Sequence, residues 1–124
     1  GPRDLYRGVM EGVAMSYRRV VDEVRTVLPE VDGIVATGGL SGQYATWVSM
    51  LADVVGLPVT PLQMKRSTLR GNAILALDVL APGVERAVPE FGDAIEPEES
   101  REALYNARYR RFLEMYERLF SSSK

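Results

Sequence analysis

The sequence predicts an α/β fold that is rich in helices and contains one short pair of strands. Three observations support this class. Apolar residues recur every three or four positions over long segments, short β-branched runs lie between these segments, and Gly or Pro separates them. Short strands that alternate with helices form an α/β layer. Because two short strands make a poor sheet on their own, we expect residues 1–124 to be a single-domain part of something larger.

The first helix is expected over residues 4–28, with Asp4 as the cap at its start and Pro29 ending the pattern. Its apolar residues recur at spacings of three and four and form one stripe, of the kind that faces a core. The charged residues of this segment fall mostly on the opposite face. The stripe contains Leu5, Val9, Val13, Tyr17, Val20, Val24 and Leu28, and the charged residues are Glu11, Arg18, Arg19, Asp22 and Arg25.

A strand, a glycine-rich turn and a second helix come next. Residues 33–37 form a short apolar run with β-branched side chains and are expected to be a buried strand. Residues 38–43 form a polar turn, and the helix is expected over residues 43–55, with Gly56 as its stop. The buried face of this helix is expected to contain Tyr44, Trp47, Val48, Leu51, Ala52 and Val55.

Another short strand and a third helix follow. Residues 57–62 are expected to be a strand or an extended edge, since Pro58 and Pro61 argue against a central position in a sheet. The helix is expected over residues 67–80. Its candidate caps are Ser67 and Thr68, and residues 81–83 end it.

The last part of the chain is expected to be a loop and a long helix. Residues 82–97 are rich in Pro, Gly and acids and are expected to lie on the surface, and Pro97 begins a helix over residues 98–120. Arginines on this helix can pair with acids at helical spacing. Its apolar and aromatic face contains Leu104, Tyr105, Ala107, Arg108, Tyr109, Phe112, Met115, Tyr116 and Leu119; the arginines are Arg108, Arg110 and Arg111, and the acids are Glu114 and Glu117.

Composition excludes several classes of function. The chain has 46% apolar and 26% charged residues, as folded soluble proteins do, and its net charge of −2 gives no support for nucleic-acid binding. It has no cysteine and no histidine, which excludes disulfides, thiolate metal sites and histidine-based catalysis. No apolar run is long enough to cross a membrane, and the first residues do not resemble a secretion signal. We therefore expect a cytoplasmic protein with no metal ligands of its own.

The strand, glycine turn and helix around residues 33–55 form an arrangement that can hold phosphate or a nucleotide. Glycines let the backbone approach a ligand closely, and the start of a helix presents free N–H groups and partial positive charge. The turn lacks the Lys and Ser/Thr of a P-loop and the spacing of a dinucleotide fingerprint. On the local pattern alone, an ordinary strand-to-helix turn is the alternative interpretation.

Four other features have both a functional and an ordinary interpretation. Asp53 and Glu11 are single carboxylates, and either could be interpreted as a catalytic base. Single acids on helices are usually solvated, however. Trp47 can stack on an adenine or belong to the core, and the apolar stripe favours the core. Gly8 and Gly12 form a small-residue pair, which in a helix that carries charges indicates close packing against a neighbouring element.

Three segments resemble the C-terminal part of the FGGY family of carbohydrate kinases, in the order and at the spacing of that family. They are "LYRGVMEGVAMSYRRVVDEV", "IVATGGLSGQYATWVSMLADVVGLPV" and "STLRGNAILAL", and they cover about residues 5–80. The Tyr-rich ending "YNARYRRFLEMYERL" also looks like the last helix of the family. The joint match is specific, whereas no single segment would be.

The resemblance implies a two-lobed kinase of the actin, Hsp70 and hexokinase type, with a ribonuclease H-like fold in each lobe and ATP and sugar bound between the lobes. This chain would be the last part of the second lobe, and the whole enzyme would transfer a phosphoryl group from ATP, with Mg²⁺, to a sugar or polyol hydroxyl. The adenosine-binding turn of the family falls on residues 38–43. The residues that the resemblance implies as nucleotide contacts are Gly38, Gly39, Leu40, Ser41 and Gln43.

The sequence also departs from the family pattern. Arg70 and Asn72 stand where the family often has small residues, although Gly71 keeps the glycine, and Arg70 faces either the nucleotide or solvent. The catalytic aspartate, the first phosphate-binding turn and the main sugar contacts of the family lie upstream of this chain. We therefore assign no catalytic residue here, and we expect the chain alone to be inactive and to self-associate. The alternative is a free-standing, non-catalytic module that binds a nucleotide or a protein.

Overall fold

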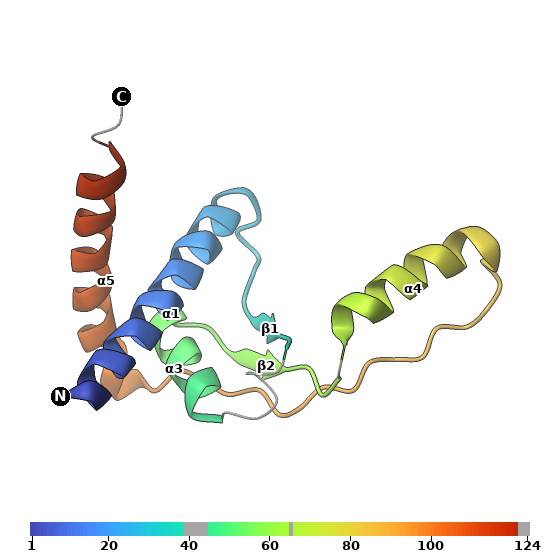
Figure 1. Cartoon of the computed structure of the whole chain (residues 1–124), viewed down its shortest axis with the longest axis horizontal. Helices are drawn as coiled ribbons and strands as arrows, with labels where there is room; N and C mark the ends of the chain where they lie inside the picture. The colour runs from blue at the N-terminus through green and yellow to red at the C-terminus, as the bar shows by residue number, and fades with distance from the viewer. Residues whose placement is uncertain (39–44, 65, 122–124) are drawn as a thin grey trace.

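The computed structural model describes residues 1–38, 45–64 and 66–121. Figure 1 shows α1 and α5 at one end, β1 and β2 in the middle, and α4 standing apart at the other end. The helices and strands that the structure describes are α1 (Pro2–Val27), β1 (Ile34–Ala36), α3 (Ala45–Val55), β2 (Val59–Pro61), α4 (Ser67–Leu80) and α5 (Glu99–Phe120).

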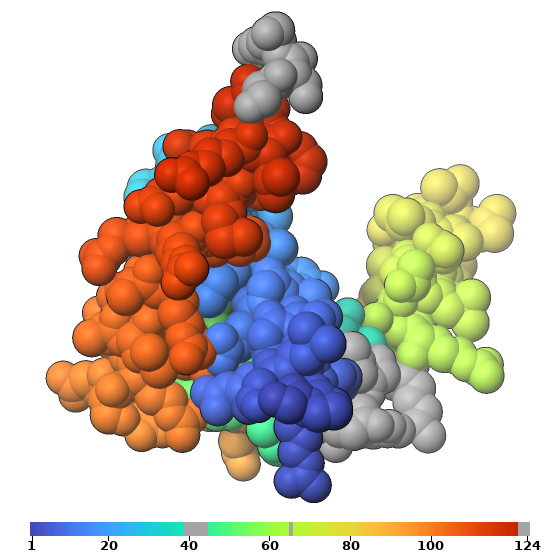
Figure 2. All heavy atoms as spheres, turned by 60° about the vertical axis from the view of Figure 1, so that its left-hand side comes forward, coloured from blue at the N-terminus to red at the C-terminus, as the bar shows by residue number. Residues whose placement is uncertain are grey.

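The core lies where α1, α3 and α5 pack against one another and against β2. Figure 2 shows α5 lying along α1, whereas α4 is separate from both. No residue of α4 is buried, so this helix contributes nothing to the core that the structure describes. The buried apolar residues are Ala14, Met15, Val48, Leu51, Ala52, Val54, Val55, Leu57, Val59, Tyr105 and Tyr109.

Strands β1 and β2 are parallel, with Ile34 opposite Val59 and Ala36 opposite Pro61, and α3 forms the crossover between them. The expectation of an edge position for β2 is wrong, because Val59 and Leu62 also form antiparallel bridges to the segment that follows α4. Proline has no backbone N–H to donate. Pro61 is tolerated there because its carbonyl only accepts, from the N–H of Gly92.

Strand β1 is shorter and less buried than expected. It covers three residues of the predicted run 33–37, and the middle one, Val35, is 54% exposed. Successive side chains of a strand point to opposite faces of the sheet. Ile34 and Ala36 pack against the core, whereas Val35 points to the other face.

Helix α1 has the expected extent, but its faces are reversed. All seven residues of the predicted apolar stripe are exposed, from Val24 at 41% to Leu5 at 73%. The buried residues of α1 are Glu11, Ala14 and Met15, which lie on the charged face. Periodicity finds a helix and its two faces, but it does not say which face has a partner.

Details of the helix ends and of the small residues also differ. Helix α1 begins before Asp4, whose carboxylate accepts a hydrogen bond from the amine of Gly1 within the first turn. An alanine Cβ built at Gly8 or Gly12 would meet nothing within 4 Å, so the expected close packing of these glycines is absent from the described residues. Helix α4 has the expected bounds, but its cap residue is Arg66, at φ 60°, and no side chain caps it.

The other two helices follow the predictions more closely. In α3, burial of Val48, Leu51, Ala52 and Val55 is confirmed, and Gly56 ends the helix at φ +73°, a conformation that favours glycine. Tyr44 lies outside the described residues. Helix α5 begins at Glu99. Tyr105 and Tyr109 are buried, whereas Leu104, Met115 and Leu119 are exposed. None of the helices that the structure describes is both long enough and apolar enough to cross a membrane.

Candidate functional site

A strand ends just before the predicted glycine turn, and a helix begins just after it. Strand β1 ends at Ala36, Gly38 is exposed and has φ +104°, and α3 begins at Ala45. Side chains rarely adopt such a φ, so Gly38 is suited to this position in a way that other residues are not. The remaining predicted contacts, Gly39, Leu40, Ser41 and Gln43, lie outside the described residues.

The first turn of α3 is suited to an anion. The N–H groups at the start of a helix have no partner within the helix and carry partial positive charge. The first turn of α3 contains no acidic residue that would oppose an anion. What the described part of the arrangement offers chemically is therefore the backbone hydrogen-bond donors of the first turn of α3.

A hollow of about 920 Å³ lies between the starts of α1, α3 and α5, beside the first turn of α3. Trp47 is half-buried, packs against the core and also lines this hollow, so it has features of both interpretations that the sequence allowed. The lining residues are Tyr6, Arg7, Met10, Ala45, Thr46, Trp47, Ser49, Met50, Asp53, Arg101 and Tyr105.

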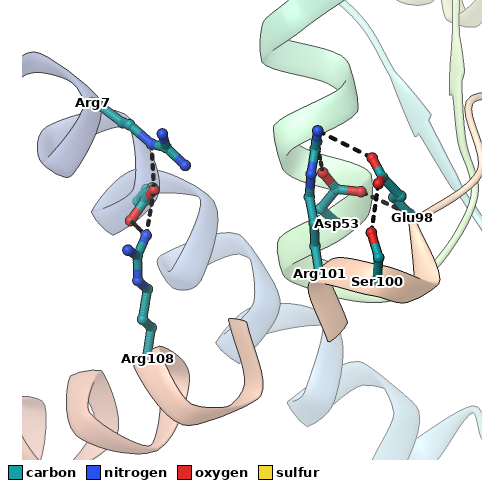
Figure 3. Close-up of polar contacts among 7 residues, drawn as sticks. Arg7, Asp53, Glu98, Ser100, Arg101 and Arg108 are labelled. Carbon is teal, nitrogen blue, oxygen red and sulfur yellow. Dashed lines mark hydrogen bonds and ion pairs between the residues drawn. The ribbon is translucent and has the colours of Figure 1, made fainter. Parts of the chain in front are cut away.

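Asp53 lies at the inner wall of this hollow and is buried, so the expectation of a solvated acid is wrong. Its carboxylate accepts one hydrogen bond from the backbone N–H of Glu98 and one from the guanidinium of Arg101, both at 2.8 Å (Figure 3). Arg101 also reaches the Glu98 carboxylate at 3.1 Å. The hydrogen bond to Asp53, followed by the charge of Glu98, raises the pKa of Arg101 above its usual value. Both oxygens of Asp53 are thus occupied by the start of α5.

Glu11 is also buried, at 7% exposed, and not solvated as expected. Its carboxylate lies between Arg7 of the same helix, at 2.9 Å, and Arg108 of α5, at 2.6 Å (Figure 3). The hydrogen bond to Glu11 raises the pKa of Arg7 above its usual value. Arg108 therefore pairs across helices and not with Glu114 or Glu117 as the helical spacing suggested.

A third polar cluster joins α1 to α5. The guanidinium of Arg18 donates to the carbonyl of Val54 at 3.0 Å and to Asn106 at 2.8 Å, and it lies 4.2 Å from the ring centre of Tyr109. The hydroxyl of Tyr109 donates to Asp22 at 2.8 Å. Burial, helped by this bond to a carboxylate, raises the pKa of Tyr109 to about 12. This cluster keeps Tyr109 neutral and fixed in the core.

Near the start of α4, Arg70 is partly exposed and forms a contact that the sequence did not predict. Its guanidinium donates to the backbone carbonyl of Ala87, so it ties α4 to the segment that follows it. A smaller hollow of about 280 Å³ lies between β1 and this end of α4 and includes Arg70 and Gly71 in its lining. Among the described residues, no three acidic side chains come close enough together to hold a metal ion.

The buried ion pairs were missed because their partners are far apart in the sequence. Asp53 and Arg101 are separated by 48 residues, and Glu11 and Arg108 by 97. No local spacing rule links residues at such distances, whereas the Arg7 and Glu11 pair, at i and i+4, has the spacing that such a rule detects.

Comparison with known proteins gives a consistent result. Residues 1–78 match the model of the FGGY family of carbohydrate kinases, C-terminal domain. The chain is 28% identical over 116 residues to an FGGY carbohydrate kinase domain-containing protein of Xenopus laevis, covering 90% of this chain and 21% of the relative. It is 24% identical over 111 residues to a probable L-xylulose kinase of Pasteurella multocida (strain Pm70), covering 90% and 23%. These matches confirm the resemblance that the sequence motifs indicated.

Two solved structures share the fold. The chain matches xylulose kinase from Rhodospirillum rubrum with a TM-score of 0.75 and 24% identity, covering 93% of this chain and 24% of that one. It matches a xyloylose kinase from Brucella ovis with a TM-score of 0.77 and 25% identity, covering 96% and 25%. The predicted helix-rich α/β class, as part of a sugar-kinase lobe, is therefore confirmed. The chain spans about a fifth to a quarter of the length of the proteins that it matches.

Proposed function

Because the chain belongs to the FGGY family of carbohydrate kinases, we propose that it is the C-terminal, nucleotide-binding part of a longer ATP-dependent kinase. The whole enzyme transfers a phosphoryl group from ATP to a sugar or polyol hydroxyl, and it works in the cytoplasm. Residues upstream of this chain supply the catalytic base and most of the sugar contacts. The chain alone does not turn over substrate.

The observation that carries the proposal is Gly38 at φ +104°, between a parallel strand and the first turn of a helix. In the proposed site, the backbone of Gly38 and Gly39 contacts the nucleotide closely. Leu40, Ser41 and Gln43 complete the turn, with Gln43 beside the adenosine. The first N–H groups of α3, which have no partner within the helix, support this assignment, since a helix start favours negatively charged ligands.

ATP brings Mg²⁺, which neutralises charge as it develops on the phosphates. The described residues of this chain offer backbone donors and not a cluster of acidic ligands, so the metal is held by the phosphates and by upstream residues. The part of this chain in catalysis is therefore positioning: it holds the nucleoside end of ATP so that the phosphates reach the acceptor.

Two surfaces support the proposal that upstream polypeptide belongs against this chain. The apolar stripe of α1 is exposed along the helix, and the edge of β1 away from β2 has no strand partner among the described residues. A large apolar surface and an open strand edge are typical of an interface. An upstream portion of the same chain fits both, because it extends the sheet at β1 and covers α1.

The nucleotide assignment is tested in the longer protein with Gly39→Val. A bulky side chain in the turn is expected to weaken binding of ADP, measured by titration calorimetry, by about tenfold or more, because it occupies space that the ligand needs. Gly8→Ala is the control, since the added Cβ meets nothing within 4 Å. Unchanged ADP affinity in Gly39→Val would remove the turn from the site.

The proposal that the chain is part of a longer kinase is tested by the mass of the native product. An antibody raised against the chain is expected to detect a band several times heavier than 13.8 kDa in the source cells. A band at 13.8 kDa would support the alternative, a free-standing module that binds a nucleotide or a protein.

A further inference from the structure

Asp53 belongs to α3, but its carboxylate accepts hydrogen bonds from residues at the start of α5. The side chain is 1% exposed, and its two oxygens accept one hydrogen bond each, from the N–H of Glu98 and from Arg101 (Figure 3). A carboxylate this buried is stable only where donors occupy its oxygens. At this point, α3 and α5 are therefore joined by a charged contact that depends on geometry.

The contact lies at the N-terminal end of α5. Glu98 is the residue that caps this helix, and its own side chain makes no capping hydrogen bond. The carboxylate of Asp53 accepts the N–H of Glu98 instead, where the helix carries partial positive charge. Helix α5 cannot slide or turn against α3 without losing this bond, the bond to Arg101, or both.

One face of α3 extends from the first turn of the helix to Asp53. Thr46, Ser49 and Asp53 line the same hollow and follow one another at spacings of three and four, so they lie on one side of the helix. Helix α3 has 11 residues, which corresponds to a rod of about 16 Å. Its first residue, Ala45, comes directly after the turn segment. A change in tilt at Asp53 therefore moves the first turn of α3, at the other end of the helix.

From this geometry we propose that Asp53 is a positioning residue for the start of α3 in the proposed nucleotide site. Through Arg101 and the N–H of Glu98, which caps α5, it fixes the orientation of α3 and so the place of its first turn, which begins at Ala45. The inference rests on the proposed function, because it names what holds that same site. It also gives α5, which lies beyond the matched family region of residues 1–78, a part in nucleotide binding.

The test uses the longer protein and the variant Asp53→Asn. Asn keeps the size of Asp, but one of its two carboxylate oxygens is replaced by an NH₂ donor. The Glu98 N–H and the Arg101 guanidinium are both donors, so one of them loses its acceptor. The KM for ATP and the Kd for ADP are expected to rise about five- to tenfold, as for coupling between separate sites. The KM for the acceptor and kcat at saturating ATP are expected to stay within about twofold, since Asp53 touches no reacting atom.

Glu11→Gln is the matched control. Glu11 is the other buried carboxylate that holds α5, but it lies on α1 and its partners are Arg7 and Arg108. Its loss is expected to lower the thermal midpoint about as much as Asp53→Asn does and to leave the KM for ATP unchanged. Arg101→Met is expected to reproduce Asp53→Asn, and Arg101→Lys, which keeps the charge, is expected to restore part of the nucleotide affinity. These two variants carry the test if Asp53→Asn does not fold.

The outcomes separate the two proposals. An equal rise of the ATP KM in Glu11→Gln, or an unchanged KM in Asp53→Asn and Arg101→Met, overturns the role of Asp53. If ADP affinity still falls in Gly39→Val, the proposed function survives that result. If the parent protein binds no ADP in the calorimeter, both proposals are overturned.

Discussion

On α1, the face with the charges packs inside the molecule and the face with the apolar stripe lies outside it. Inside, Glu11 pairs with Arg108, and Arg18 lies over Tyr109. Outside, the stripe that includes Leu5 and Val9 has no packing partner among the described residues. The comparison shows that a helix face is buried by a matching surface and not by its apolar content alone. Charges pack when each one meets its opposite with good geometry.

The largest effect is expected from breaking the inner face with Arg108→Ala. The change leaves the buried carboxylate of Glu11 with Arg7 alone, and we expect a loss of about 3 kcal/mol in the free energy of unfolding. Urea unfolding of the chain at one fixed protein concentration measures it. Arg110→Ala, at an exposed position of the same helix, is the control and is expected to change stability by less than about 0.5 kcal/mol.

A smaller loss is expected from Arg18→Lys. Lysine keeps the charge but cannot reach the Val54 carbonyl and Asn106 together or lie flat on the Tyr109 ring, so the loss is about 2 kcal/mol. The same change at the exposed Arg25 of α1 is the control. Equal urea midpoints for the two variants would show that only the charge of Arg18 matters.

The inner face also predicts a dependence on pH. The pKa of Tyr109 is raised to about 12, so stability from the neutral phenol is complete below the unfolded value of about 10 and is lost as the pH rises toward 12. Between pH 10 and 12, the parent is expected to lose about 1–2 kcal/mol more than Tyr109→Phe, which has no such proton. Unfolding free energies with parallel pH profiles in the two proteins would contradict the burial of a neutral Tyr109 phenol.

The smallest effect on folding is expected at the outer face. Val9→Lys with Val20→Lys removes two exposed apolar side chains, and we expect the free energy of unfolding to change by less than about 0.5 kcal/mol. The change is expected to weaken self-association of the isolated chain, measured by sedimentation over a range of concentrations, because the stripe is the proposed contact surface. Association that is as strong in the double variant would place the contact elsewhere.

The sequence was sufficient for the elements because their signals are local. Spacings of three and four predicted α1, cap and stop residues predicted α4, and Gly56 marked the end of α3 correctly, because backbone preferences act within a few residues. The central place of β2 was not predictable from Pro58 and Pro61, since proline removes one donor and leaves the carbonyls free to bridge. Which face of α1 is buried depended on α3 and α5, whose contacting residues lie 36 to 97 positions away.

The candidate site divides in the same way. The local pattern of strand, glycine and helix predicted a turn at Gly38, where the positive φ lies, and the family resemblance implied Gly38 as a nucleotide contact. Asp53 was expected to be solvated, because nothing near it in the sequence announces Arg101 or the start of α5. A carboxylate is stable in a buried position only where the fold places hydrogen-bond donors beside it. The sequence near Asp53 does not show these donors, because they come from α5.

The separation of Glu11 and Arg108 by 97 residues also matters for synthesis on the ribosome. At common elongation rates, about 5–20 s pass between the two codons. Throughout that interval the inner face of α1 has no α5 to meet, whereas α3 is made well before α5. Helix α1 therefore has time to pack against α3 first, and α5 joins the two helices last.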